Sequence, residues 1–483
     1  MKANLIQSLC VVFRQRRLKN SLELRVLVLG LLLVSYATSF AQTVEAKKSP
    51  TGKRPNIIFI LADDVGYEGF STYGSASYQT PNIDKLALKG VKFTHCYSTP
   101  LCTPSRIMLM TGKYNFRNYE EFGYLNPNEK TFGNILKDAG YNTCISGKWQ
   151  LNGIAQKMPG YESADRPNQF GFDEYCLWQL QYGKKMGERY ADPLIIQNGK
   201  ALPRERDAFG PDIFCQYVLD FIDRKKDDSK PFFVYYTMPL VHDPFVPTPD
   251  SKDWSDTTKR YADSTQYFKD MVSYMDKNIG AVMNKLEKDG LAENTLVIFA
   301  GDNGTSRRIT SKMTNGETVK GDKGYLTDGG THVPLIAYWK GRSLQGNVSS
   351  DLIDFSDFLP TMLDVAKVPA PAGFVIDGKS FLPQIVNKKS SSKEYVYMYY
   401  KPKWAGFENG VFVRDKSYKL YGDGRFYNVE KDKEELHDLN TTTLTPKEQA
   451  IKNKLSDFLK KLPNVEPLSE KEKAYWKNLK VES

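Results

Sequence analysis

Cysteine and histidine are scarce in this chain, which has six cysteines and four histidines among its 483 residues. The cysteines stand at irregular spacings, and none belongs to a pattern with the spacing of a zinc site. A chain of this length can build a core large enough to need no disulfide framework. The sequence therefore argues against a disulfide-stapled module and against a cysteine–histidine metal domain.

Long apolar runs, internal repeats and low-complexity tracts are absent as well. The apolar run 26–34 is much shorter than the about 20 residues that a membrane-spanning helix needs. It follows a basic leader and precedes Ser39-Phe40-Ala41, which fits a cleavage site between small residues. We predict a signal peptide over residues 1–41 and a polar linker over 42–54, with an uncleaved membrane anchor as the alternative. The mature protein is then secreted or periplasmic, with a bacterial periplasm favoured and no membrane span in the mature chain.

A strong excess of charge of one sign is also missing from the predicted mature chain. The formal net charge is +10, but the leader carries six basic side chains and one acid, so about half of that charge leaves with it. A mildly basic protein lacks the electrostatic footprint of nucleic-acid binding. We expect no nucleic-acid partner. The remaining positive excess suits an acidic substrate, and a solvated surface explains it equally well.

Continuous apolar runs of strand length recur along the chain, which is typical of parallel strands buried on both faces. The runs cover 55–62, 141–146, 232–237 and 296–300, with a fifth candidate at 333–339. Helical patterns lie between or after them, over 82–89, 132–139, 213–226, 261–289 and 355–366. This alternation predicts an α/β fold with a large, mainly parallel sheet flanked by helices.

The pattern changes after about residue 370, where short aromatic segments alternate with turn residues. The segments are 395–400, 410–414, 418–421 and 425–429, and a charged helical pattern follows over 446–461. We therefore predict a catalytic α/β domain over 55–370 and a smaller C-terminal subdomain over 371–483, built from an antiparallel sheet and a helix.

The segment Cys102-Thr103-Pro104-Ser105-Arg106 is the most informative short motif of the chain. Pro104 suits the first turn of a helix, and the apolar run 107–110 continues that helix. A helix N-terminus attracts anions, and the guanidinium of Arg106 adds donors for a tetrahedral oxyanion. We infer a reactive side chain beside an anion cradle, with a lowered thiol pKa for Cys102. The alternative is a small buried thiol.

Polar side chains follow four of the predicted strands, at the edge where ligands bind in open parallel sheets. They are Asp63 and Asp64, Lys148 with its neighbours, His242, and Asp302 with Asn303. Three carboxylates this close cannot all stay ionised without a cation, and an all-oxygen set suits Ca²⁺ or Mg²⁺. The alternative is that Asp63-Asp64 and Asp302-Asn303-Gly304 are ordinary turns.

These motifs together resemble the type I sulfatases of the alkaline-phosphatase-like superfamily, in order, over about residues 54–440. The resemblance is carried by the following segments: 55–64, 80–86, 102–106, 147–149, 302–304, 321–324, 328–334 and 435–439. It implies an alkaline-phosphatase-like fold and the hydrolysis of sulfate esters. A sulfated glycan is the favoured substrate class, by analogy with secreted members of the family.

The resemblance also implies the chemistry of the site. A maturation enzyme would convert Cys102 into formylglycine, whose hydrate attacks sulfur and then expels sulfate as the aldehyde returns. Ca²⁺, with Mg²⁺ less favoured, would be held by Asp63, Asp64, Asp302, Asn303 and the converted Cys102. Arg106, Lys148 and Lys323 would neutralise the hydrate and the sulfate oxygens, and His242 would protonate the leaving oxygen. The substrate would contact Gln150, Arg106, Lys148, His242 and Lys323.

Two positions depart from the common family pattern. Gln150 follows Gly147-Lys148-Trp149, where the family commonly has histidine. An amide cannot shuttle a proton near neutral pH, so His242, water or a neighbouring group would have to deprotonate the hydrate. His332 stands where arginine is common, and we expect it to alter packing or pocket shape instead of the reaction.

Two other functions remain open at this stage. The first is a phosphonate or phosphate ester hydrolase of the same superfamily, and the second is a non-catalytic relative that binds a sulfated glycan. The segments 151–206 and 307–319 are candidate substrate loops, because loops of this kind shape the pockets of α/β enzymes.

Overall fold

The computed structural model describes residues 53–178, 180, 188–388 and 391–478, and residues from Thr51 onward belong to one unit. The predicted signal peptide and nearly all of the predicted linker lie outside the described residues. Among the described residues, no helix is both long enough and apolar enough to cross a membrane.

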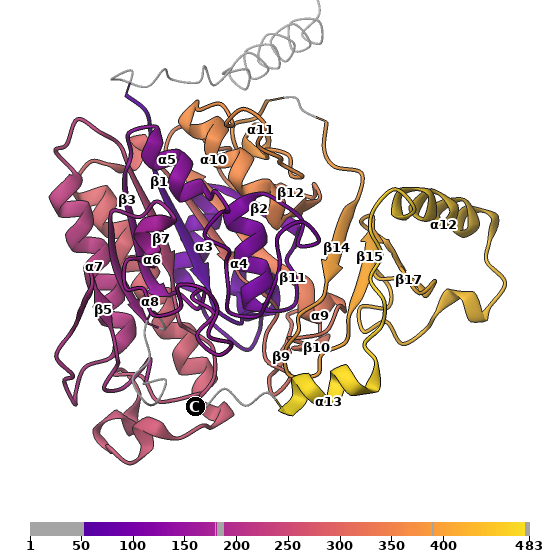
Figure 1. Ribbon diagram of the computed structural model, residues 1–483, viewed down its shortest axis with the longest axis horizontal. Helices are drawn as coiled ribbons and strands as arrows, with labels where there is room; N and C mark the ends of the chain where they lie inside the picture. Colours follow the sequence, from indigo (N-terminus) through magenta and orange to yellow (C-terminus); the bar gives the residue numbers. More distant parts are fainter. Residues whose placement is uncertain (1–52, 179, 181–187, 389–390, 479–483) are drawn as a thin grey trace, which may run out of the picture. The chain divides into compact units, whose positions relative to one another are not determined.

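The main sheet has eleven strands among the described residues. The strands at its centre run parallel to one another (Figure 1). The five central strands, in spatial order, are β8 (Thr295–Gly301), β1 (Asn56–Ala62), β7 (Phe232–Thr237), β3 (Asn142–Lys148) and β4 (Glu174–Trp178). Beyond β8 lie β11 (His332–Trp339), β2 (Val91–Tyr97), β12 (Asn347–Ser349) and β13 (Ile353–Asp354), and beyond β4 lie β5 (Ile196–Gln197) and β6 (Lys200–Ala201).

Helices cover both faces of this sheet. In β1, Ile57, Phe59 and Leu61 pack into one apolar core, and the alternate side chains pack into a second core on the other face. The first core includes residues of α4 (Cys102–Thr111), α5 (Phe132–Asp138) and α10 (Phe358–Ala366). The second includes residues of α3 (Pro81–Lys89), α7 (Gly210–Lys225) and α8 (Phe268–Lys288). The continuous apolar runs are explained by this double burial.

A second, smaller sheet lies in the C-terminal part of the chain. Its strands are antiparallel: β14 (Val396–Tyr400), β15 (Gly410–Arg414), β16 (Tyr418–Tyr421) and β17 (Phe426–Asn428). Helix α12 (Pro446–Leu459) packs on it through Leu455, and α13 (Glu470–Asn478) follows. Further short elements are α6 (Arg166–Gln169), β9 (Thr310–Lys312), β10 (Thr318–Lys320), α9 (Asp328–Thr331) and α11 (Leu382–Ile385), besides several short 3-10 helices. The predicted fold class is confirmed in both of its parts.

Two predicted elements differ in detail from the structure. The fifth apolar run forms β11, but it runs antiparallel to β8 because residues 302–331 stay at the edge where β8 ends. The long helical pattern 261–289 yields a helix only from Phe268. Asp263 accepts a hydrogen bond from the Phe245 amide at 3.0 Å and pairs with Arg308, which holds this stretch outside the helix. Strands β2 and β4 and helix α13 were not predicted from the sequence.

Candidate active site

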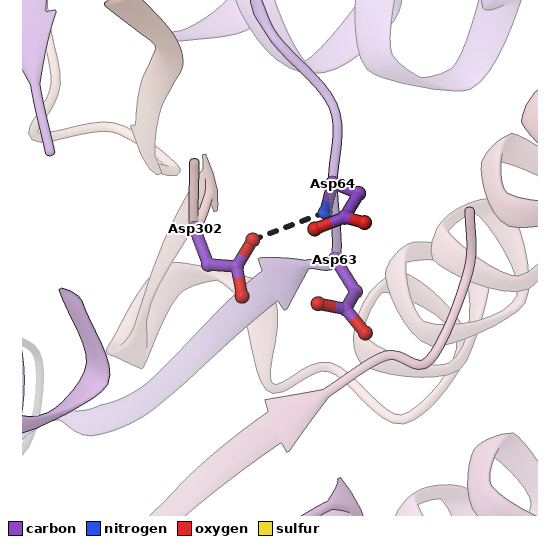
Figure 2. Close-up of side chains that lie close together, drawn as sticks. All are labelled: Asp63, Asp64 and Asp302. Carbon is purple, nitrogen blue, oxygen red and sulfur yellow. Dashed lines mark hydrogen bonds between the residues drawn. The ribbon is translucent and has the colours of Figure 1, made fainter. Parts of the chain in front are cut away.

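Three carboxylates meet at the carboxyl ends of β1 and β8. Asp63 and Asp64 follow β1, Asp302 follows β8, and one oxygen from each of the three lies within 4.8 Å of the others. All three are at most 1% exposed, and Figure 2 shows the Asp64 amide donating a hydrogen bond to Asp302 Oδ1, at 3.0 Å. The parallel pairing of Ala62 with Gly301 brings the strand ends level and produces this cluster.

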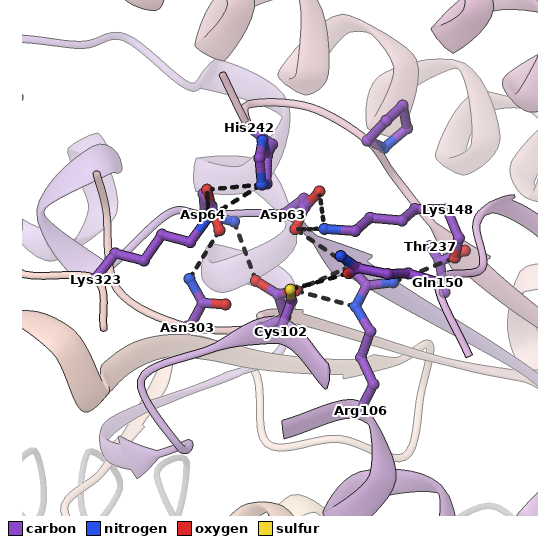
Figure 3. Close-up of polar contacts among 12 residues, drawn as sticks. Asp63, Asp64, Cys102, Arg106, Lys148, Gln150, Thr237, His242, Asn303 and Lys323 are labelled. Carbon is purple, nitrogen blue, oxygen red and sulfur yellow. Dashed lines mark hydrogen bonds and ion pairs between the residues drawn. The ribbon is translucent and has the colours of Figure 1, made fainter. Parts of the chain in front are cut away.

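Three cationic side chains surround the carboxylates (Figure 3). Arg106, in α4, donates from Nε and Nη2 to Asp302 Oδ2 at 3.1 and 2.9 Å. Lys148, at the end of β3, contacts both oxygens of Asp63 at 2.8 and 2.9 Å. Lys323 Nζ lies 2.5 Å from Asp64 Oδ2. The three positive charges thus match the three carboxylates one for one.

The pKa values of Asp63 and Asp302 shift in opposite directions in this site. Burial opposes the ionisation of Asp63, but Lys148, His242 and Arg106 together hold its pKa below the usual range. Burial and the neighbouring charge of Asp63 raise the pKa of Asp302. Crowded carboxylates of this kind need additional positive charge to remain ionised together.

The donor atoms fit a hard divalent cation. Asn303 Oδ1 is buried and has no hydrogen-bond partner among the described residues, while its Nδ2 donates to Asp64 Oδ1 at 2.9 Å. A buried acceptor without a donor is rare, and a cation satisfies it. The set Asp63, Asp64, Asp302 and Asn303 supplies only oxygen atoms, as Ca²⁺ and Mg²⁺ require. These four residues could therefore hold the predicted metal.

Cys102 is the first residue of α4, as the sequence predicts, and it is only 2% exposed. Its Sγ donates to Gln150 Oε1 at 3.0 Å. The expected lowering of the thiol pKa is wrong, because burial raises the pKa of Cys102 above its ordinary value despite the nearby charges of Lys148 and Lys323. An unmodified thiol here is not poised as a thiolate.

His242, on the loop after β7, lies next to Lys323 (Figure 3). On its other ring nitrogen it contacts Asp243. Its Nδ1 is 2.9 Å from Asp243 Oδ1 and 2.6 Å from the Asp243 carbonyl oxygen, so this nitrogen carries a hydrogen. Its Nε2 faces Lys323 Nζ at 3.0 Å and accepts from it. Burial lowers the pKa of His242, consistent with a neutral ring in this arrangement.

A cavity of about 530 Å³ opens next to these groups. It is lined by five residues of the predicted site, Cys102, Lys148, Gln150, His242 and Lys323, and by Asp243, the sequence neighbour of His242. It is also lined by Leu101, Phe122, Trp178, Arg189, Ser306, Arg307, Tyr325, Trp404, Ala405 and Phe407. The structure therefore brings every predicted site residue together, although Arg106 and the carboxylates lie beneath the cavity wall.

Several residues that line the cavity were not predicted individually from the sequence. Arg189 and Arg307 lie within the two predicted substrate loops, whereas Phe122, Trp404 and Phe407 carried no signal in the sequence. Trp404 belongs to the loop between β14 and β15, so the smaller sheet contributes to the cavity of the larger one. A single unaligned sequence contains no pattern that pairs that loop with Cys102.

His332 does not line the cavity. Its Nδ1 contacts Asp328 Oδ2 at 3.0 Å, and its Nε2 contacts the Thr94 carbonyl oxygen at 2.9 Å. Its ring also packs on Tyr67 and Tyr97. These contacts agree with the expectation that His332 affects packing.

Comparison with known proteins identifies the family to which this chain belongs. The chain matches the family model "Sulfatase" over residues 55–368 and the model "N-sulphoglucosamine sulphohydrolase, C-terminal" over residues 316–464. It is 30% identical over 379 residues to the N-acetylgalactosamine-6-sulfatase of Canis lupus familiaris, covering 71% of this chain and 68% of the relative. It is 26% identical over 507 residues to the N-acetylglucosamine-6-O-sulfatase of Bacteroides thetaiotaomicron, covering 85% of both.

A solved structure supports the same fold. The structure of BT4656 in complex with its substrate D-glucosamine-2-N,6-O-disulfate is similar with a TM-score of 0.68 and 24% identity, covering 89% of this chain and 100% of that chain. The family model spans well over half of this chain, and the 30% identity extends over two thirds of both partners. The chain therefore belongs to the sulfatase family of sulfuric ester hydrolases, with an alkaline-phosphatase-like α/β fold.

Proposed function

We propose that this protein is a secreted or periplasmic sulfatase that removes a sulfate ester from a sulfated carbohydrate. The observation that carries the proposal is the position of Cys102, which lines the cavity beside Lys148, Lys323 and His242 and above the acidic cluster. The curated relatives are named for sulfated amino sugars, and the aromatic side chains of the cavity suit a pyranose ring.

Edman sequencing of the mature protein is expected to begin at Gln42.

Two groups would complete the site: formylglycine, made from Cys102 by a maturation enzyme, and Ca²⁺ on Asp63, Asp64, Asp302 and Asn303. The aldehyde hydrate supplies an oxygen nucleophile, and the metal supplies positive charge next to it. The chain's own cations and carboxylates balance one another. The completed site would therefore carry an excess positive charge, which favours a sulfate ester and its developing negative charge.

The chain's own residues divide the remaining work. Arg106 is 1% exposed and binds Asp302 and Asp63, so it holds the carboxylates in place and adds positive charge beneath the cavity. Lys148 and Lys323 line the cavity and would bind sulfate oxygens. The proton for the leaving oxygen would be held between Lys323 Nζ and His242 Nε2, which lie 3.0 Å apart.

Gln150 would hold the reacting group of residue 102 instead of moving a proton. Its Oε1 accepts a hydrogen bond from Cys102 Sγ, and its side chain lines the cavity. We predict that Gln150→His changes KM for an aryl sulfate while kcat stays within about 3-fold, because it reshapes the pocket without supplying a missing step. Steady-state kinetics measure this split, with Gln216→His on the exposed side of α7 as control. A large rise in kcat alone would show that a proton acceptor was lacking.

Removal of the metal is expected to inactivate the enzyme reversibly. Treatment with EDTA should lower sulfate release at least about 10-fold, because the buried carboxylates lose their neutralising charge. Added CaCl₂ should restore the rate more fully than MgCl₂, since Ca²⁺ accepts the irregular oxygen geometries that Mg²⁺ rejects. Sulfate release and the melting temperature are both measured after dialysis. Full activity in dialysed, EDTA-treated protein would refute the metal site.

Two measurements separate this function from its alternatives. Turnover of 4-nitrophenyl sulfate and of a phosphonate monoester is compared, and faster hydrolysis of the phosphonate would favour the phosphonate hydrolase. Mass spectrometry of the tryptic peptide Phe93–Arg106 from the native host tests whether Cys102 has become an aldehyde. Tight binding of a sulfated sugar without sulfate release, together with an intact thiol, would identify a non-catalytic binding protein.

A further inference from the structure

The cations that line the cavity differ in how far their charges are already neutralised. Lys148 pairs with Asp63, and Lys323 pairs with Asp64. Arg307 pairs through Nε with Asp322 at 3.1 Å. Within the described part of the chain, Arg189 is the lining cation for which no carboxylate lies within ion-pair distance.

The guanidinium of Arg189 also has an unused donor. Its Nη1 is buried and makes no hydrogen bond to a described residue. The guanidinium carbon lies 4.1 Å from the ring centre of Trp178, which stabilises the cation without using its in-plane N–H groups. Among the described residues, the one carboxylate that lines the same cavity belongs to Asp243, and it is hydrogen-bonded to His242 Nδ1. The neighbouring segment 179–187 contains no Asp or Glu that could serve as a partner.

Aromatic side chains form an uncharged, apolar part of the cavity wall. Trp404 stacks on Phe122 with ring centres 4.4 Å apart, and Phe407 meets Tyr325 edge to face at 5.6 Å. The loop that carries them is anchored, because Lys403 Nζ pairs with Glu121 at 2.9 Å and Tyr119 donates to the Pro402 carbonyl oxygen at 2.6 Å. The cavity thus combines a fixed aromatic surface with a guanidinium that has no ion-pair partner among the described residues.

We propose that Arg189 is a specificity-determining residue, and that it binds a second anionic group, a sulfate or carboxylate, on the same sugar that carries the scissile ester. The proposal rests on the proposed function, since it names the substrate class as dianionic sulfated sugars. A buried guanidinium N–H without a partner carries a desolvation cost, and an oxygen of an anionic substrate group that accepts from it removes that cost. Lys148 and Lys323 lie near Cys102 and would bind the sulfate ester that is cleaved. Arg189 would therefore bind the second anion at a separate place in the cavity.

The test measures binding in the absence of turnover. Isothermal titration is performed on the Cys102→Ala variant with two matched pairs: N-acetyl-D-glucosamine 6-O-sulfate against D-glucosamine-2-N,6-O-disulfate, and glucose 2-sulfate against glucuronic acid 2-sulfate. We expect the dianionic member of at least one pair to bind about 10-fold more tightly or better, the effect of one charge-assisted contact. Adding Arg189→Ala should reduce that ratio to near one, and Arg189→Lys should restore part of it.

Arg204→Ala serves as the matched control, because Arg204 is a surface arginine already paired with Asp192 and does not line the cavity. It should leave the affinity ratio unchanged. Equal affinity for both members of each pair, or a preference that survives Arg189→Ala, would overturn the inference. Failure of the proposed function has a different signature, since the unmutated protein would then release no sulfate from any ester while these affinities remain measurable.

Discussion

Replacing Cys102 with alanine should lower the hydrolysis of 4-nitrophenyl sulfate by roughly 10⁴-fold or more, a loss typical of removing a covalent nucleophile. Alanine keeps Cβ but lacks the thiol that is oxidised when the aldehyde forms, so no aldehyde can be made, and the surrounding cations and carboxylates stay in place. The side chain is small and buried at the start of α4, so the fold should persist. Sulfate release by the purified variant is the measurement, together with its melting temperature.

A second buried cysteine provides the control for this substitution. Cys215 lies on α7 with its Sγ 3.6 Å from the Asn278 carbonyl oxygen, away from the cavity. Cys215→Ala should cost on the order of 1 kcal/mol of stability and leave turnover nearly unchanged. A Cys102→Ala enzyme that retains more than about a tenth of its turnover would remove the nucleophile assignment.

Asp302→Asn should lower kcat/KM about 10³-fold and abolish the stabilisation that Ca²⁺ provides. Asparagine keeps the shape of the side chain but loses the charge that faces the metal. It also leaves Arg106 with Asp63 as its remaining carboxylate, at 3.4 Å instead of the 2.9 Å to Asp302. Breaking a buried ion pair in this way destabilises a protein by about 3–5 kcal/mol. The melting temperature with and without CaCl₂ separates the loss of the metal from the loss of the ion pair.

The buried acid Asp357 offers a matched comparison. It is 1% exposed and pairs with Lys393 at 2.6 Å, but it lies outside the cavity. Asp357→Asn should therefore lower the melting temperature while the rise caused by Ca²⁺ remains. If Asp302→Asn kept the same calcium-dependent rise, Asp302 could not be a ligand of the metal.

The sequence was sufficient to predict which side chains gather at the site because those residues stand at the ends of strands. Asp63 follows an apolar run buried on both faces, and Lys148 and Asp302 follow others of the same kind. In a parallel sheet these ends meet at one edge, so the order of strands did not need to be known. The helix beginning at Cys102 followed in the same way from local proline and apolar signals.

Local sequence rules described the protonation state of Cys102 and the walls of the cavity poorly. The thiol pKa rises because Cys102 is buried, and burial depends on which distant segments cover a helix end. Trp404 reaches the cavity from the loop between β14 and β15. Arg189 has no ion-pair partner among the described residues, because the Asp243 carboxylate that shares its cavity is bound to His242. Short stretches of sequence are thus enough to predict where these strands end and where this helix begins. Burial, charge pairing and pocket shape depend on residues far apart in the chain, so they emerged only when the chain was folded.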